Sequence, residues 1–339
     1  MLHTRRRFLA VAAAMVGTMP LALSATAATT SAVNKPATPE EILSLFQSLP
    51  GETSIKIHAP AINGKPEFLV ASRNTSKRMF VGSAIKTFIL CESLRQVDSP
   101  DLVKTLTANQ LTLDASVWSV GSPTFNPPNL IGKVSQRTAL EAMIQHSDNT
   151  ATDMSIKHAG PDNVRKFIAS AGLKNTMIPE STRTFFGYIL GAKDYKNFTW
   201  GELEADDNQP TVNPPMNTVE TLASSADDLV SYYERALQGE FFKNKATLNE
   251  FRRILSMGDA IWALPVPLGV SAFMKGGSID VKGFHAVCAS GAMFFDDRWV
   301  YFCLTTNWDA KAATDPDAVK AFLAAGSRAL TRVKETLSA

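Results

Sequence analysis

The chain has 339 residues, of which 45% are apolar and 19% are charged, and its 34 lysines and arginines nearly balance 32 aspartates and glutamates. This length and apolar content predict one large domain or two ordinary ones with a buried core. The net charge of +2 excludes a strong basic field for nucleic acid. Three cysteines are too few for a fold held by disulfides or for a zinc ribbon.

The N-terminus predicts an export signal. The sequence TRRRFL at residues 4–9 is followed by an uncharged apolar run to Leu23 and by small residues at 25–28. A basic head, a short apolar middle and an A-x-A end are typical of a cleaved signal, and the adjacent arginines resemble a twin-arginine signal. Because the apolar run is too short to span a bilayer, an uncleaved anchor is the weaker alternative. We therefore expect residues 1–28 to be removed and the protein to be periplasmic or secreted, without stable membrane insertion.

Strand-forming segments are expected at both ends of the mature chain, with helices between them. Apolar residues three and four apart predict helices, and β-branched or aromatic runs bounded by turn residues predict strands. The predicted strands are 53–58, 67–72, 272–276, 285–295 and 299–306. The predicted helices are 40–49, 83–97, most of 105–175, 225–237 and 315–338. Residues 179–217 show little periodicity and are expected to form a long loop.

This distribution predicts one sheet assembled from the two chain ends, with a helical insertion. After a linker at 29–39, an α/β subdomain would comprise residues 40–104 and 220–339. A helical subdomain at 105–219 would include the long loop.

The sequence SAIK at residues 83–86 opens an apolar helix. The i, i+3 spacing places the Ser83 hydroxyl and the Lys86 amine on one helix face. A serine needs a base to become a nucleophile, and a lysine in apolar surroundings can lose its proton near neutral pH. The alternative is an ordinary helix cap with a lysine whose amine reaches solvent.

Two further motifs follow in the chain. The sequence SDN at residues 147–149 suits a helix N-cap, or a loop that presents a hydroxyl and an amide to a cleft. The sequence KGGS at residues 275–278 suits a turn, or a strand along which glycines let a substrate approach the backbone.

Together and in this order, the three motifs resemble the set that marks class A β-lactamases within the penicillin-recognising serine hydrolases. The resemblance extends over residues 40–339, from the hairpin before the nucleophile helix to the last strands and helix. It includes a loop that corresponds to the omega loop. It implies an α/β sandwich, in which an antiparallel sheet is flanked by helices and carries an inserted all-helical subdomain.

The resemblance implies four catalytic residues. Ser83 would be the acylated nucleophile and Lys86 its general base or proton relay. Ser147 would pass the proton to the departing lactam nitrogen. Relatives carry an omega-loop glutamate that activates the deacylating water, followed at fixed places by leucine and asparagine. The nearest candidate is Glu180, which lacks that leucine and asparagine, so an exposed loop glutamate is the alternative.

The resemblance also implies a substrate-binding set. Asn149 would bind the side-chain amide of the substrate, and Lys275 would supply positive potential beside Ser147. Gly277 and Ser278 would line the strand edge. The backbone N–H groups of Ser83 and Ser278 would form an oxyanion hole, which stabilises charge that develops in the transition state.

Two departures from the family pattern concern substrate recognition and turnover. Gly276 replaces the residue whose hydroxyl would hold a β-lactam carboxylate, and Lys282 could supply an anchor unless it is an exposed strand-end lysine. The stretch from Ser147 to Lys275 is longer than the family pattern, with extra residues around 185–188.

The other candidate groups are weaker. His146 could line the cleft or pack beside the helix cap. Cys288 and Cys303 fall on neighbouring predicted strands and could form a bridge, or remain free thiols. No His, Cys and Asp cluster has metal-ligand spacing, so neither a metal nor a cofactor is expected.

We expect an exported class A β-lactamase-like serine hydrolase that opens a β-lactam amide through a Ser83 acyl-enzyme. One alternative is a D-Ala-D-Ala peptidase or esterase on the same fold, and another is a penicillin-binding protein that acylates without turnover. The partner would be a small β-lactam or peptidoglycan-like molecule and not nucleic acid. We expect a monomer.

Overall fold

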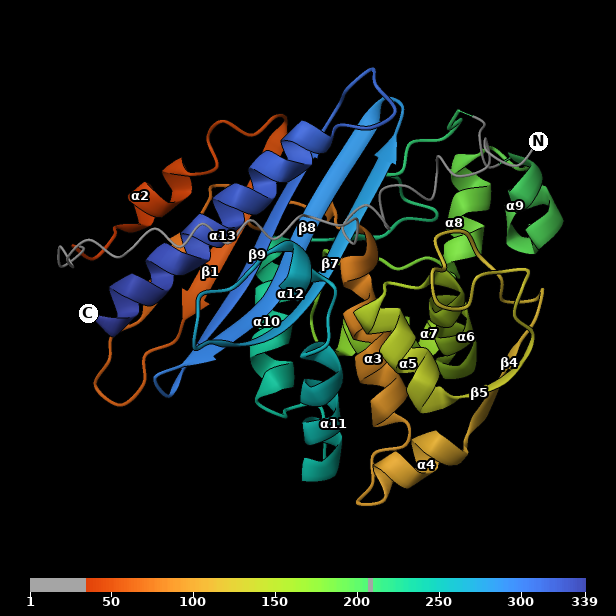
Figure 1. The fold of residues 1–339 in the computed structure, drawn as a ribbon, viewed down its shortest axis with the longest axis horizontal. Helices are drawn as coiled ribbons and strands as arrows, with labels where there is room; N and C mark the ends of the chain where they lie inside the picture. The colour runs from red at the N-terminus through yellow and green to blue at the C-terminus, as the bar shows by residue number, and fades with distance from the viewer. Residues whose placement is uncertain (1–34, 207–209) are drawn as a thin grey trace, which may run out of the picture.

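The computed structural model describes residues 35–206 and 210–339 (Figure 1). The predicted export signal and most of the predicted linker lie outside these residues. The strands are β1 (Glu52–Ala59), β2 (Phe68–Ala71), β3 (Met79–Phe80), β4 (Gln110–Leu113), β5 (Gly132–Ser135), β6 (Ala223–Ser224), β7 (Ser271–Val281), β8 (Phe284–Phe295) and β9 (Arg298–Trp308). The helices are α2 (Pro39–Ser44), α3 (Lys86–Arg95), α4 (Leu102–Ala108), α5 (Gln136–Gln145), α6 (Asn149–Ala159), α7 (Pro161–Ser170), α8 (Thr182–Ile189), α9 (Trp200–Asp206), α10 (Ala226–Leu237), α11 (Lys245–Leu255), α12 (Ala260–Ala263) and α13 (Pro316–Ser338), with 3-10 turns η1 (Gly82–Ile85) and η2 (Tyr195–Asn197).

The central sheet has five antiparallel strands in the order β2-β1-β9-β8-β7. Strands from both chain ends lie side by side because β1 pairs with β9, which confirms the predicted assembly of the sheet. Tight turns with positive φ join neighbouring strands, at Asn63 and Gly64 between β1 and β2 and at Asp296 and Asp297 between β8 and β9. Aspartate, asparagine and glycine tolerate this left-handed backbone better than other residues.

Helices cover both faces of the sheet (Figure 1). On one face, α2 and α13 pack on a core that includes Phe302 and Phe322. On the other face, α10 packs against β1, β8 and β9. The helices α3 to α8 gather beside the edge strand β7 and share a second core with α10. The fold is therefore the predicted mixture of an antiparallel sheet, flanking helices and an inserted helical region.

The inserted region differs in two places from the sequence prediction. It is not all helical, because β4 and β5 form a short hairpin in which Leu111 and Leu113 are buried and their neighbours are exposed. The predicted loop at 179–217 contains α8, which begins at a capping box between Ser181 and Thr184. Four residues of alternation and two turns of helix are too short to give a clear period in the sequence.

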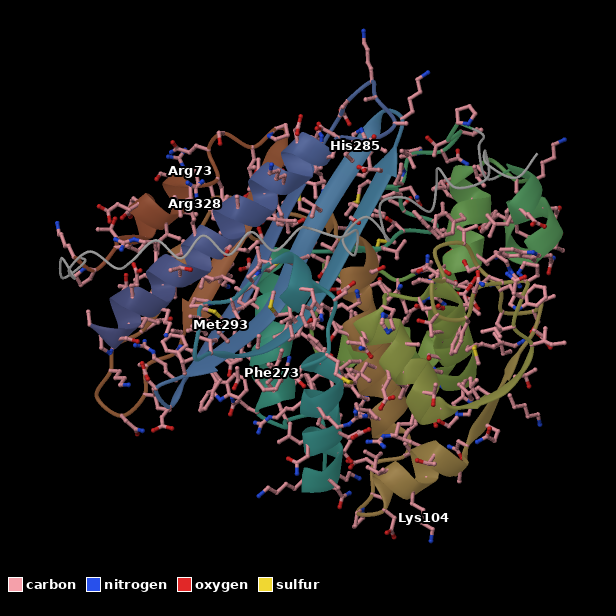
Figure 2. The ribbon with its side chains drawn as sticks, viewed as in Figure 1. Arg73, Lys104, Phe273, His285, Met293 and Arg328 are labelled. Carbon is pink, nitrogen blue, oxygen red and sulfur yellow. The ribbon has the colours of Figure 1, made fainter. Side chains whose placement is uncertain are left out.

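Figure 2 labels His285 and Met293 on β8, and both side chains are completely buried. Nδ1 of His285 lies 2.7 Å from Oδ1 of Asp280, and its ring stacks on Trp308. His285 is thus part of the packed interior of the sheet.

Among the described residues, no helix combines the length and the apolar character needed to cross a membrane.

Candidate active site

Ser83 lies in η1, between the short strand β3 and the buried helix α3. The backbone N–H groups of Val81 and Gly82 both donate to the carbonyl of Leu222, which fixes the chain just before the serine. Ser83 is partly exposed, whereas Lys86, one helical turn later, is completely buried. The local fold therefore presents the hydroxyl to solvent and holds the amine inside.

Strand β7 lies directly against η1 because Gly277 has no side chain. A Cβ at this position would lie 2.0 Å from the carbonyl oxygen of Val81 and 2.6 Å from the nitrogen of Ser83. A Cβ at Gly82 would lie 2.8 Å from the nitrogen of Ser278. The two glycines thus bring the backbones of Ser83 and Ser278 together, in the arrangement expected of an oxyanion hole. Gly277 acts here through close backbone packing.

The ammonium of Lys86 is held by the loop that connects α5 and α6. Its Nζ atom donates to the carbonyl oxygen of Ser147 at 2.6 Å, to Oδ1 of Asn149 at 2.8 Å and to Oγ of Ser147 at 3.2 Å. The first two motifs of the sequence therefore meet in space, although more than sixty residues separate them. Nδ2 of Asn149 donates to the carbonyl of Val120 at 2.7 Å, so this amide is held at both ends.

Burial lowers the pKa of Lys86 to about 7. The positive charge of Lys275 lowers this pKa further, while the carboxylates of Asp259, Asp148 and Asp153 oppose the shift. A lysine with this pKa is a free base in part of the molecules at neutral pH. It can accept a proton from a nearby hydroxyl, which is the property that nucleophilic catalysis by serine needs.

Ser147 lies between two lysines. Its Oγ atom accepts from Nζ of Lys86 at 3.2 Å and from Nζ of Lys275 at 3.1 Å. Ser147 has a backbone φ of +53°, which is unusual for a residue other than glycine. The buried Asp148 holds this conformation, because its carboxylate accepts the backbone N–H groups of Ala151 and Phe125 at 2.7 and 2.9 Å. Strain of this kind is common at functional sites.

The structure adds Asp259, a residue that the sequence analysis missed. Its Oδ2 atom lies 2.6 Å from Nζ of Lys275, and its Oδ1 atom accepts the N–H of Gly276 at 3.0 Å. Asp259 begins the short helix α12, which packs on β7. Asp259 belongs to none of the three sequence motifs. Only its contacts with Lys275 and Gly276 in the folded chain show that it is part of the site.

Glu180 is not among the residues that the structure brings together at Lys86 and Ser147. Its carboxylate is half exposed, and its Oε2 atom lies 2.9 Å from an N–H group of Arg165 on the surface. The buried Asp153 accepts the backbone N–H groups of Thr182 and Arg183 at 2.6 and 3.1 Å. These bonds turn Thr182 inward at the start of α8, and Glu180 faces Arg165.

Thr182 takes the inner position on this loop. Its hydroxyl donates to Oδ1 of Asp153 at 2.8 Å and lies 3.4 Å from the carbonyl oxygen of Asn149. Burial raises the pKa of Asp153 to about 6, and its bonds to Thr182 oppose that shift. Thr182 thus brings a hydroxyl against the start of α6.

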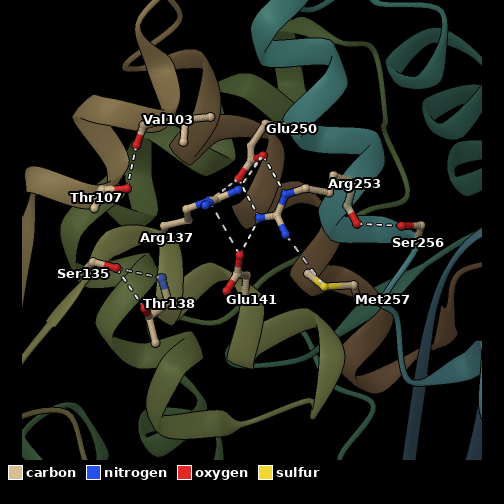
Figure 3. A network of polar contacts seen from close by, with 10 residues as sticks. All are labelled: Val103, Thr107, Ser135, Arg137, Thr138, Glu141, Glu250, Arg253, Ser256 and Met257. Carbon is tan, nitrogen blue, oxygen red and sulfur yellow. Dashed lines mark hydrogen bonds and ion pairs between the residues drawn. The ribbon is translucent and has the colours of Figure 1, made fainter.

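An ion-pair network connects α5 with α11 (Figure 3). The buried Glu250 accepts from Arg137 at 2.8 Å and from Arg253 at 2.7 Å, and Arg253 also pairs with Glu141. Burial raises the pKa of Glu250, but the guanidinium groups of Arg253 and Arg137 outweigh this effect and hold the pKa below its usual range. Because α5 leads into the SDN loop and α11 leads towards Asp259, the network fixes the relative position of two sides of the site.

The remaining candidates lie apart from the cluster. His146 and Lys282 are exposed. Cys288 and Cys303 are buried free thiols, so the possible bridge is not formed. In the part of the chain that the structure describes, no group of three His, Cys, Asp or Glu residues could hold a metal ion.

Comparisons with known proteins identify the family and agree with the fold. The family model described as "Beta-lactamase enzyme family" matches residues 38–333. The solved TLA-3 extended-spectrum beta-lactamase superposes with a TM-score of 0.66 at 15% identity, covering 87% of this chain and 96% of that one. A class A beta-lactamase from Bacteroides cellulosilyticus gives 0.64 at 18% identity, covering 89% and 99%. The structure of PBP-A gives 0.63 at 17% identity, covering 87% and 95%. No curated protein matches the sequence.

Proposed function

The chain belongs to the beta-lactamase enzyme family, and from this premise we propose that it is a serine hydrolase that forms an acyl-enzyme on Ser83. The observation that carries the proposal is the meeting of the three motifs. Lys86 and Lys275 both donate to Ser147, and Gly277 brings Ser278 against Ser83. These are the groups that acyl transfer needs: a nucleophile, a base, a proton relay and a pair of backbone donors.

The acylation step begins with Lys86 in its free-base form. Lys86 accepts the Ser83 proton as the serine oxygen bonds to the substrate carbonyl carbon. The negative charge that develops on the carbonyl oxygen is stabilised by the N–H groups of Ser83 and Ser278. Ser147 then passes a proton to the departing nitrogen or oxygen and regains one from Lys86. The product is an ester on Ser83, with the new amine still attached when the substrate is a lactam and with a released amine or alcohol when it is an acyclic amide or an ester.

Deacylation would use water and the same lysine. Since Glu180 pairs with Arg165 and Thr182 takes the inner position, no carboxylate in the described part of residues 179–217 is hydrogen-bonded to Lys86, Ser147 or Lys275. Lys86 would accept a proton from the water whose oxygen bonds to the acyl carbon, and would return it through Ser147 to the Ser83 oxygen as the ester bond breaks. We therefore propose that hydrolysis of the acyl-enzyme is slower than its formation. This favours a penicillin-binding or peptidase-like activity over rapid β-lactam turnover.

A second candidate, hydrolysis of esters, is favoured by a specific contact. Lys275, which the family resemblance expects to supply positive potential beside Ser147, is bonded to Asp259, and Gly276 lacks the hydroxyl that would hold a β-lactam carboxylate. Ester and lactam substrates share the acylation chemistry described above. They differ in the group that must fit beside Lys275.

The test is intact-mass spectrometry of the mature protein mixed with a penicillin, a chromogenic cephalosporin and a panel of acyl esters. We expect an adduct on Ser83 that outlasts the mixing time. Absence of an adduct and of turnover with every compound would contradict the proposal.

We further propose that the protein is exported by the twin-arginine route. We also propose that the exported protein is a monomer. The basic, apolar and small-residue segments within residues 1–28 support export. The test is fractionation of expressing cells, in which replacement of Arg5 and Arg6 by lysine should abolish processing. Unchanged processing would contradict this route, and gel filtration would test the monomer.

A further inference from the structure

When both are protonated, the two lysines of the site have no hydrogen-bond donors left for a substrate. A lysine ammonium has three donors. Those of Lys275 are directed to Oδ2 of Asp259 at 2.6 Å, the carbonyl of Gly276 at 2.8 Å and Oγ of Ser147 at 3.1 Å. Lys86 likewise makes three bonds within the cluster. An anionic group arriving beside Lys275 would therefore have to displace a protein group.

The protein group that occupies this place is itself an anion. The Asp259 side chain is 21% exposed, whereas that of Lys275 is completely buried, so Asp259 is the member of the pair that solvent reaches. Its second oxygen accepts the N–H of Gly276. Gly276 offers no hydroxyl, and a Cβ built there would lie 3.4 Å from Oδ1 of Asp259. The strand edge beside the nucleophile thus presents a carboxylate.

The wider charge balance has the same sign. The charges that act on Lys86 are one ammonium, Lys275, and three carboxylates, Asp259, Asp148 and Asp153. Burial raises the pKa of both Asp148 and Asp153. Asp259 is the partly exposed member of the set, and like charges brought close together in a protein repel strongly.

We infer that Asp259 is a specificity residue that makes this site select neutral acyl substrates and disfavour those with a carboxylate beside the scissile bond. The substrate class is an ester or amide in which the substituent that lies beside Gly276 is uncharged. This inference rests on the proposed acylation of Ser83 and narrows its substrate. The carboxylate of Asp259 takes the place beside Lys275 that a substrate carboxylate would need.

The experiment compares benzylpenicillin with its methyl ester, which have the same lactam ring and differ in one charge. Rate constants for acylation of Ser83 are measured by intact-mass spectrometry. We expect the wild-type protein to react with the ester at least about tenfold faster, relative to the intrinsic reactivity of each compound. Asp259→Asn removes the charge and keeps the shape, and it should shift the ratio towards the acid by about tenfold.

The matched control is Asp162→Asn. Asp162 is an exposed partner of Arg165 on α7, so the same charge change there should leave the ratio unaltered. The double variant Asp259→Asn with Gly276→Ser adds a hydroxyl where there is room for it, and should favour the acid further. Because the wild-type ratio needs no variant, the test does not depend on the folding of any substitution.

Three outcomes would overturn the inference. The first is wild-type acylation by the acid as fast as by the ester, which leaves the proposed Ser83 chemistry intact. The second is an acid-to-ester ratio that Asp259→Asn does not change. The third is a lack of Ser83 acylation by either compound and by the panel of esters, which would overturn the proposed function as well.

Discussion

Nζ of Lys86 lies 2.6 Å from the carbonyl oxygen of Ser147, a contact between the first turn of α3 and the loop before α6. The contact joins the sheet-side nucleophile to the helical insertion, so it depends on the packing of two distant segments. It also explains the strained backbone of Ser147, whose positive φ places both its carbonyl and its hydroxyl within reach of the ammonium. The base and the proton relay are thereby positioned by one loop.

Acylation should depend on pH through Lys86. Burial holds the pKa of this lysine at about 7, and the reacting form is the deprotonated one. The acylation rate should therefore rise by about tenfold per pH unit below that value and level off above it. Stopped-flow measurements with a neutral ester between pH 5 and 9 would check this. A rate that falls as the pH rises through 7 would contradict the role of Lys86 as base.

Replacement of Lys86 by arginine should abolish the rise of the acylation rate with pH. An arginine keeps the charge but does not lose its proton in this pH range. The acylation rate should fall by at least about 100-fold at pH 8. Circular dichroism would verify that the variant is folded.

The variant Glu180→Gln should leave both acylation and deacylation nearly unchanged. The carboxylate of Glu180 faces Arg165 on the surface, and an exposed pair of this kind contributes about 0–1 kcal/mol to stability. The measurement is the lifetime of the acyl-enzyme by mass spectrometry, with wild type as the reference. Accumulation of adduct in the variant alone would show that Glu180 activates water after all.

Two neighbouring glycines should respond differently to alanine. Gly277→Ala places a Cβ 2.0 Å from the Val81 carbonyl, so it should destabilise the fold by about 1–3 kcal/mol and abolish acylation. In Gly276→Ala the added Cβ meets only ordinary contacts at 3.4 Å. The free energy of unfolding of this variant should therefore lie within about 0.5 kcal/mol of the wild-type value. Thermal unfolding of both variants compares them directly. Equal stability would contradict the close approach of β7 to η1.

Much of the fold follows from local patterns in the sequence. Turn residues at Asn63-Gly64 and Asp296-Asp297 set the hairpins, and the three motifs occur where a buried helix, a helix cap and a strand are predicted. The match of the family model confirms the family resemblance. By contrast, α8 was predicted as loop because its two turns are too short to give a clear period.

The details of the site were harder to predict because they depend on contacts between distant residues. Asp259 lies 16 residues before Lys275, in no motif, and its role arises from the packing of α12 on β7. Glu180 matched the family pattern only by position in the chain. Its orientation is decided by Asp153, which captures the two backbone N–H groups that follow Ser181. Neither relationship leaves a signal in a single sequence.

The central claim is that Ser83 is the acylated nucleophile. Its most direct test is intact-mass spectrometry with peptide mapping, comparing wild type with Ser83→Ala after incubation with an acyl ester and a β-lactam. We predict an adduct on the peptide that contains Ser83 in the wild type, and neither adduct nor turnover in the variant. Ser83 is partly exposed, so the variant should fold normally. Hydrolysis retained by Ser83→Ala, or an adduct on another residue, would contradict the account.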